Sequence, residues 1–146
     1  MFAAGLVTLS SCDSFLDVEA EGNPTTTNYF ANDQQAIDAV DGCYARLSQE
    51  DVYGREIYWE QGATNEVVWG RVRSGYPQLA RLEYTGDESP LRGVWNNVYK
   101  QNINRSNWVI KSLLAKSSLT AIEKRSLGEA YFLRAWGHFI IASRYG

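Results

Sequence analysis

Apolar and polar positions follow helical spacing in three stretches of the chain. In the first stretch, residues 32–47, apolar side chains recur every three or four positions and most acidic side chains take the other face. The apolar positions are Ala36, Ile37, Val40, Cys43, Tyr44 and Leu47. Asn32 precedes them, and Gln35 can reach back to the helix start. The pattern predicts an amphipathic helix capped by Asn32.

A second helix is predicted from residue 90 to residue 116. Ser89 is placed to cap it, and Pro90 suits the first helical position, where its missing N–H costs nothing. A broad apolar stripe then runs from Trp95 to Leu114, with Asn102 and Ser106 lying on it. Because polar groups on a packed face need hydrogen-bond partners, we expect a polar cluster in the interface with the next helix.

The third helix is predicted from Thr120 to the last residue, Gly146. Thr120 and Glu123 form a capping box. Residues 130–141 are apolar almost all round the helix, which predicts cover on several sides. Within this helix we expect His138 to be a hydrogen-bonded core residue and Arg134 a paired structural cation. The short turn at residues 117–118 predicts an antiparallel helical hairpin.

The hairpin has features of a helical repeat. Ala135 and Phe139 show the small-then-aromatic spacing of such hairpins, and residues 95–130 span about one tetratricopeptide repeat. Repeat units gain stability by stacking, so the hairpin needs further helices unless residues 32–47 cover it. The predicted fold class is mainly α: a tetratricopeptide-like helical hairpin, an N-terminal helix and a long irregular loop.

That loop covers residues 48–88, where glycines and Pro77 interrupt every helical period. We expect irregular structure with short strands at residues 66–69 and 79–84. The chain has five Trp and 13% aromatic residues, and this segment holds several of them among polar groups. Long irregular segments in small domains are commonly functional, so this is the first candidate for a binding surface.

The first residues have the form of a lipoprotein signal. Residues 2–9 are apolar and too few to cross a bilayer, and they lead through Ser10 and Ser11 to Cys12, whose thiol can be acylated. We therefore divide the chain into a signal peptide (1–11), an acidic tether and linker (12–31) and a helical domain (32–146). The alternative is an ordinary frayed terminus. Cys43 is then left without a disulfide partner, and we expect it to be buried.

The net charge and the available metal-binding and catalytic residue types argue against several functions. A net charge of −3 without a basic block argues against nucleic acid. One histidine and no ligand spacing argue against a metal site, and no cofactor is predicted. Glu60 and Glu66 could form a glycosidase pair, which needs carboxyl groups roughly 5–9.5 Å apart. Because no nucleophile motif accompanies them, we expect no enzyme activity.

Six features in order resemble the N-terminal part of the RagB/SusD family, over essentially the whole chain. They are the Cys12 site, residues 15–17, the Asn23-Pro24 link, residues 42–47, the series Trp95, Tyr99, Ile103 and Asn107, and residues 129–135 with Tyr145-Gly146. The resemblance implies a lipid-anchored outer-membrane protein, surface-exposed and all-helical. Such proteins bind glycans or other nutrients and cover a TonB-dependent (SusC-like) transporter. Family proteins are several times longer, so the chain resembles a fragment.

The resemblance also points to ligand-binding residues in the irregular segment. Residues 65 and 66 lie where family members often carry an Asp-Glu pair, and Asn65 departs from that pattern by losing a charge. Glycan recognition needs flat apolar surfaces together with carboxylate, amide and guanidinium groups. The predicted ligand-binding residues are Trp59, Asn65, Glu66, Trp69, Arg71, Arg73 and Tyr76. The alternative is that the tryptophans are core residues and the arginines form solvated ion pairs.

Two other functions stay open. The chain can instead be a helical interaction module of the transporter complex without a ligand site of its own, and a hydrolase is a third, weaker hypothesis. Nothing in the spacing distinguishes starch from another glycan or a peptide.

Overall fold

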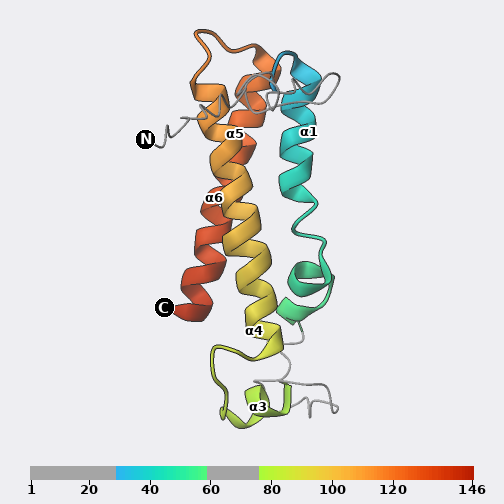
Figure 1. Ribbon diagram of the computed structural model, residues 1–146, viewed down its shortest axis with the longest axis vertical. Coiled ribbons are helices and arrows are strands. Elements are labelled where there is room, and N and C mark those ends of the chain that lie inside the picture. Colours follow the sequence, from blue (N-terminus) through green and yellow to red (C-terminus); the bar gives the residue numbers. More distant parts are fainter. Residues whose placement is uncertain (1–28, 59–75) are drawn as a thin grey trace, which may run out of the picture.

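The computed structural model describes residues 29–58 and 76–146, which form an elongated helical bundle (Figure 1). Its elements are α1 (Asp33–Tyr44), η2 (Glu50–Gly54), α3 (Tyr76–Arg81), α4 (Ser89–Val94), η3 (Trp95–Ile103), α5 (Asn104–Leu114) and α6 (Ala121–Tyr145). The segments α4, η3 and α5 continue one another as a single rod, with α6 antiparallel beside it (Figure 1). This confirms the mainly helical fold and the predicted hairpin.

The first predicted helix is confirmed together with its cap, but it ends at Tyr44, so Leu47 lies beyond it, and Tyr44 is exposed. The Asn32 side chain accepts a hydrogen bond from the backbone N–H of Gln35 at 3.0 Å, and the Gln35 side chain accepts one from the N–H of Ala31 at 2.7 Å. Its buried positions are Ala36, Val40 and Cys43. The cysteine is a free, buried thiol, as expected, and burial raises its pKa.

The rod begins one residue earlier than predicted. Glu88, not Ser89, is the N-cap residue of α4, and no side chain caps it. Pro90 lies in the first turn, where a missing N–H leaves no hydrogen bond unmade. Between residues 95 and 103 the backbone has π-helical hydrogen bonding, which the apolar spacing did not indicate. The rod is therefore continuous, while its backbone hydrogen bonding changes from α-helical in α4 to π-helical in η3 and back to α-helical in α5.

The capping box at the start of α6 is confirmed and belongs to a larger network. Thr120 accepts from the N–H of Glu123 at 3.1 Å, and the Glu123 carboxylate accepts from the N–H of Thr120 at 3.0 Å. The buried Glu123 carboxylate also pairs with Lys116, whose ammonium group donates to the carbonyl of Phe30 at 2.9 Å. These bonds hold the hairpin turn to the residues that precede α1.

The expectation that α6 is enclosed on several sides is wrong for one of its faces. Ala130, Leu133 and Ile140 are buried, but Phe132 and Phe139 are 62% and 69% exposed. Helical packing covers only the face turned toward the rod and α1, so the apolar sequence did not show which face stays open.

Two predictions for side chains of α6 also need correction. His138 is exposed and is not a core residue. Arg134 donates to the Asn107 side chain at 3.1 Å and lies 5.0 Å from the centre of the Tyr131 ring. Among residues 29–58 and 76–146 its contacts are an amide and an aromatic ring, and no buried carboxylate there would lose its partner if Arg134 were truncated.

The polar residues of the rod's apolar stripe, Asn102 and Ser106, are buried, and Oδ1 of Asn102 lies beside Gly137 of α6, the next helix. The rod also makes hydrogen bonds to α1, which the sequence did not indicate. Asn102 donates to the carbonyl of Cys43 at 3.3 Å, and Arg105 donates to the carbonyl of Gly42 at 3.1 Å. These carbonyls belong to the last turn of α1, where the i+4 N–H donors of a helix run out, and the carbonyl of Cys43 also accepts from the N–H of Arg46 at 3.1 Å. The rod thus satisfies the C-terminal end of α1.

The expected strand at residues 79–84 is not present, because residues 76–81 form α3. Tyr76 and Leu79 are three residues apart and both are buried, which is helical spacing. The expected strand at residues 66–69 lies outside the described residues. Within 29–58 and 76–146 the structure has no strand.

Three apolar clusters follow one another along the bundle. The largest joins α1, α5 and α6 around residues such as Val40, Val109 and Leu133. The middle cluster contains Val52, Ile57, Val94, Val98 and Ile140, with Trp136 and Ile141 packed against it. The third contains Tyr76, Leu79 and Leu91 with Tyr145. The middle and third clusters support the ends of the segment that carries the predicted binding residues.

Candidate functional site

Most predicted binding residues fall outside the described part of the chain. They are Trp59, Asn65, Glu66, Trp69, Arg71 and Arg73, and the predicted lipidation residue Cys12 also lies outside it. Tyr76 is described, and its side chain is only 4% exposed at the start of α3. Its hydroxyl donates to the Glu56 carboxylate. Tyr76 is therefore bonded within the protein. Trp59 and Trp69, for which a core role is the alternative, lie outside the described residues.

A buried polar cluster joins Glu56, which precedes residues 59–75, to Tyr76, which follows them. Glu56 is 5% exposed and pairs with Arg55, whose Nη2 lies 2.6 Å from Glu56 Oε1. The other carboxylate oxygen accepts the hydroxyl of Tyr76, and Arg55 also pairs with the exposed Glu50. Burial, then the bond to Glu56, raises the pKa of Tyr76. We call Arg55, Glu56 and Tyr76 the clamp.

An aromatic cluster lies in the middle of the bundle, and two of its residues are close in sequence to Arg55 and Glu56 of the clamp. Tyr53 belongs to η2, Tyr58 follows it, and Trp136 comes from α6. The ring centres of Tyr53 and Tyr58 are 6.0 Å apart, and those of Tyr53 and Trp136 are 5.5 Å apart. The indole N–H of Trp136 donates to the Tyr53 hydroxyl at 3.0 Å. We call these three residues the aromatic platform.

Sequence reasoning did not single out Trp136. It lies in the stretch of α6 that reads as continuously apolar, so it was counted with the core. In the structure it packs against the edge of the middle cluster and is only partly buried. Its indole N–H could have indicated this position. A buried indole N–H requires a hydrogen-bond acceptor, and a purely apolar interior supplies none, so the tryptophan is expected at the edge of the core.

A second aromatic group lies farther along the bundle. Trp95 and Tyr99 stack with ring centres 4.6 Å apart and planes inclined by 28°, and Tyr145 meets Trp95 edge-on at 5.1 Å. The hydroxyl of Tyr145 donates to the carbonyl of Leu91 at 2.5 Å. These rings fasten the end of α6 to the rod.

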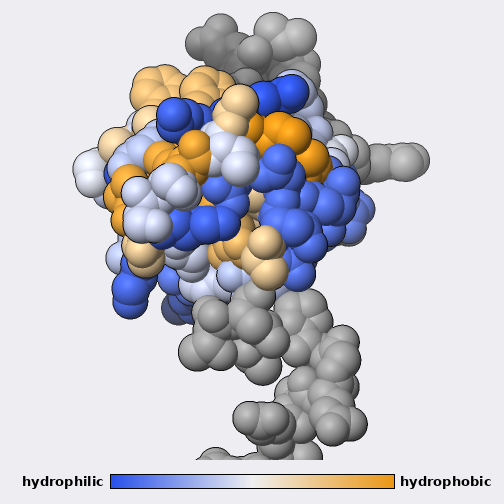
Figure 2. Space-filling view, turned by 90° about the horizontal axis from the view of Figure 1, so that it is seen from above, coloured by the Kyte–Doolittle hydropathy of each residue, from blue (hydrophilic) through white to orange (hydrophobic). Residues whose placement is uncertain are grey.

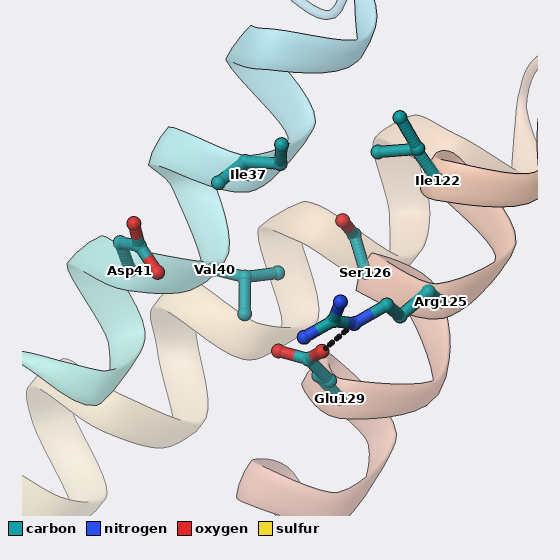
Figure 3. A pocket seen from close by; sticks show the side chains of 7 residues that line it. All are labelled: Ile37, Val40, Asp41, Ile122, Arg125, Ser126 and Glu129. Atoms are coloured by element: carbon teal, nitrogen blue, oxygen red, sulfur yellow. Dashed lines mark hydrogen bonds and ion pairs between the residues drawn. The ribbon is translucent and has the colours of Figure 1, made fainter.

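A small groove lies between α1 and the first half of α6 (Figure 3). Its volume is about 210 Å³, and it is lined by Ile37, Val40, Asp41, Ile122, Arg125, Ser126 and Glu129. Arg125 donates to Glu129 at 2.7 Å across its wall. Drug-sized ligand pockets usually have about 300–1,000 Å³. Viewed from above, this end of the bundle mixes hydrophobic and hydrophilic residues (Figure 2).

The described residues offer no arrangement for metal chemistry. No group of three or more His, Cys, Asp or Glu side chains among residues 29–58 and 76–146 could hold a metal ion. The carboxylates considered for hydrolysis, Glu60 and Glu66, lie outside the described part. None of the helices that the structure describes is long and apolar enough to cross a bilayer.

Comparison with known proteins gives one family. The model of a SusD-like family, described as starch-binding and associating with the outer membrane, matches residues 14–146. Neither the search of curated proteins nor the search of solved structures found a match.

Proposed function

Because the chain belongs to the SusD-like family of starch-binding proteins that associate with the outer membrane, we propose that it binds a glycan at the cell surface. In this proposal it does no chemistry on the glycan and passes it to a TonB-dependent, SusC-like transporter. The ligand-binding residues are those of the irregular segment: Trp59, Asn65, Glu66, Trp69, Arg71 and Arg73.

The observation that supports this assignment most is the clamp. Its bond between Glu56 and Tyr76 joins positions twenty residues apart, on either side of the proposed binding segment. Both side chains are buried, so the bond is shielded from competing water. A binding loop carried by a rigid scaffold is a common arrangement, because the scaffold limits the entropy lost on ligand binding. In this proposal Tyr76 supports the segment, and residues 59–73 contact the ligand.

Substitution of Trp69 tests the proposed site. We expect the full chain to bind a glycan from a panel that includes starch, and Trp69→Ala to weaken binding about two- to twelvefold, the range for loss of one aromatic contact. Isothermal titration calorimetry and affinity electrophoresis measure this. Tyr131→Ala is a matched control, because Tyr131 is an exposed aromatic residue on α6. Equal binding by wild type and Trp69→Ala would remove Trp69 from the site.

The absence of catalysis is tested on the same glycans. Glu66 is the carboxylate best suited to a hydrolytic role in the segment, so Glu66→Gln is the informative variant. We expect no reducing ends to appear with wild type or variant. Release by wild type that stops in Glu66→Gln would make the protein a hydrolase.

Anchoring through Cys12 is a separate part of the proposal. It is supported by the apolar run and the small residues before the cysteine. We expect Cys12→Ala to move the protein from the membrane fraction to the soluble fraction, because the acyl chains contribute most of the membrane affinity. Immunoblotting of fractionated cells measures this, and a variant that stays in the membrane would contradict a lipid anchor.

A second candidate function is a docking module for the transporter, and the open face of α6 favours it. Tyr131, Phe132 and Phe139 are exposed there, and exposed aromatic residues are enriched at protein interfaces. On this hypothesis Phe132→Ala with Phe139→Ala abolishes co-purification with the transporter while Trp69→Ala does not. Glycan binding by the chain alone would show that docking is not its sole function.

A further inference from the structure

The aromatic platform of Tyr53, Tyr58 and Trp136 is not among the residues assigned to the binding segment. We infer that it is a second carbohydrate contact, on which a pyranose ring of the bound glycan stacks. This inference rests on the proposed function, since it assigns a further subsite to the same glycan.

Exposure and ring geometry carry the argument. The side chain of Tyr58 is 59% exposed and that of Tyr53 is 36% exposed. Neighbouring ring centres are 5.5–6.0 Å apart, so the three rings form one continuous aromatic surface. Their planes are inclined by 47° and 40°, so the rings are tilted against one another and do not form a closed face-to-face stack. The C–H face of a pyranose is a flat, weakly polar surface that packs well on such rings.

The platform is held rigidly by its sequence neighbours. Val52 and Ile57 directly precede the two tyrosines, Ile140 lies one helical turn after Trp136, and all three are buried in the middle cluster. Each exposed ring is therefore attached to a backbone position fixed by a core side chain. A surface whose side chains are already ordered loses little conformational entropy when a ligand binds, so more of the contact energy becomes affinity.

Hydrogen bonding orients the platform and provides polar groups at its edge. The indole N–H of Trp136 is satisfied by the Tyr53 hydroxyl at 3.0 Å, which fixes the indole relative to the tyrosine ring. A phenolic hydroxyl both donates and accepts, so Tyr53 can still donate to a ligand oxygen. Sugar rings combine apolar faces with peripheral hydroxyls, and this surface offers both kinds of partner.

The second aromatic group differs in how its rings are arranged, although Tyr99 is 45% exposed. Trp95 and Tyr99 lie nearly parallel at 4.6 Å, so each ring covers a face of the other. Tyr145 covers the edge of Trp95 and bonds to the rod. A ring face that is covered by another ring is not available to a sugar, and in this group both stacked rings lose one face; we therefore assign the contact to the platform, where the rings are tilted and Tyr58 is 59% exposed.

Calorimetry with maltoheptaose, a soluble starch fragment, tests the inference on the full chain. We expect Tyr58→Ala and Trp136→Ala each to weaken binding about two- to twelvefold, the effect of losing one aromatic contact. Tyr58→Phe keeps the ring and should bind within about twofold of wild type, because stacking does not need the hydroxyl. Tyr131→Ala is the control for loss of an exposed aromatic residue elsewhere on α6. Thermal melts check that each variant is folded.

The outcomes separate this inference from the proposed function. If wild type binds maltoheptaose and both Tyr58→Ala and Trp136→Ala bind it equally well, the platform is not a glycan contact, while the proposed function stands. Equal losses in Tyr58→Ala and Tyr58→Phe also overturn it, since the hydroxyl and not the ring would then matter. If wild type binds neither maltoheptaose nor any glycan of the panel, the proposed function fails and the platform fails with it.

Discussion

Two glycines of α6 should respond to the same substitution with opposite signs. Gly137 is buried where α6 crosses η3, and a Cβ atom added there would lie 2.7 Å from Cγ1 of Ile103 and 3.1 Å from Oδ1 of Asn102. Gly128 lies on the exposed side of the same helix, and an added Cβ would meet nothing within 4 Å. Close packing requires glycine at residue 137, whereas nothing in the described structure requires it at residue 128.

The magnitudes follow from two competing effects. Alanine stabilises a helix interior relative to glycine by about 0.5–1 kcal/mol, and this applies to both positions. At residue 137 the added methyl group also overpacks a buried contact, which costs about 1–3 kcal/mol. Ile103 is β-branched and Asn102 is buried, so neither can turn aside freely. We expect Gly128→Ala to raise the free energy of unfolding by about 0.5–1 kcal/mol and Gly137→Ala to lower it by roughly 0–2.5 kcal/mol.

Circular dichroism at increasing temperature and urea concentration measures both variants. For a chain of this size 1 kcal/mol corresponds to about 2–4 °C in Tm, so the two variants should differ by several degrees. Both variants replace a glycine of the same helix with alanine, so the entropy of the unfolded chain changes equally in both. This contribution cancels when the two variants are compared. Shifts of the same sign and size in both variants would refute close packing at Gly137.

The remaining predictions concern buried polar groups. Tyr76→Phe removes a hydrogen bond to the Glu56 carboxylate and should lower the free energy of unfolding by about 1.5–3 kcal/mol, measured by urea unfolding; an unchanged midpoint would show that the clamp adds no stability. Glu123→Gln should cost a similar amount, because Lys116 loses its charged partner. The bond from Lys116, then that from the backbone of Thr120, lowers the pKa of Glu123. Its contribution is therefore complete above the unfolded pKa of about 4.3 and is lost as the pH falls through the lower folded value. Unfolding measured from pH 7 to pH 3 should show a weaker acid destabilisation in Glu123→Gln, and identical pH profiles would contradict this assignment.

The sequence predicted those parts of the fold that depend on neighbours along the chain. The caps at Asn32 and Thr120 involve side chains within four residues of the backbone groups they satisfy, so spacing alone identifies them. The antiparallel hairpin follows from the short turn between two periodic segments. By contrast, the contacts of Asn102 and Arg105 with α1 span 59 and 63 residues. No local pattern gives that register, and the sequence therefore did not indicate these bonds to α1.

The candidate site was harder to predict, because exposed and buried aromatic residues have the same sequence signature. Tyr76 was counted as a ligand residue from its polar, glycine-rich surroundings, but a carboxylate twenty residues earlier draws its hydroxyl into the interior. Trp136 was counted with the core from its apolar surroundings, but only part of its ring is covered. In both cases tertiary packing determines whether the ring is buried. The periodicity of the sequence carries no information about which residues cover the ring.

Close packing and the aromatic platform meet on α6, because Gly137 directly follows Trp136 in the chain. The absence of a side chain at residue 137 lets α6 approach η3 closely, and the preceding residue, Trp136, donates to Tyr53 of η2. A methyl group at residue 137 must move α6 or its neighbours by several tenths of an ångström, and a hydrogen bond weakens steeply with such displacement. Gly137→Ala should therefore weaken maltoheptaose binding even where the protein is fully folded, while Gly128→Ala should leave binding unchanged. If Gly137→Ala binds as wild type does at a temperature well below its Tm, the orientation of Trp136 does not matter for the glycan, and the contribution of the platform must come from Tyr58.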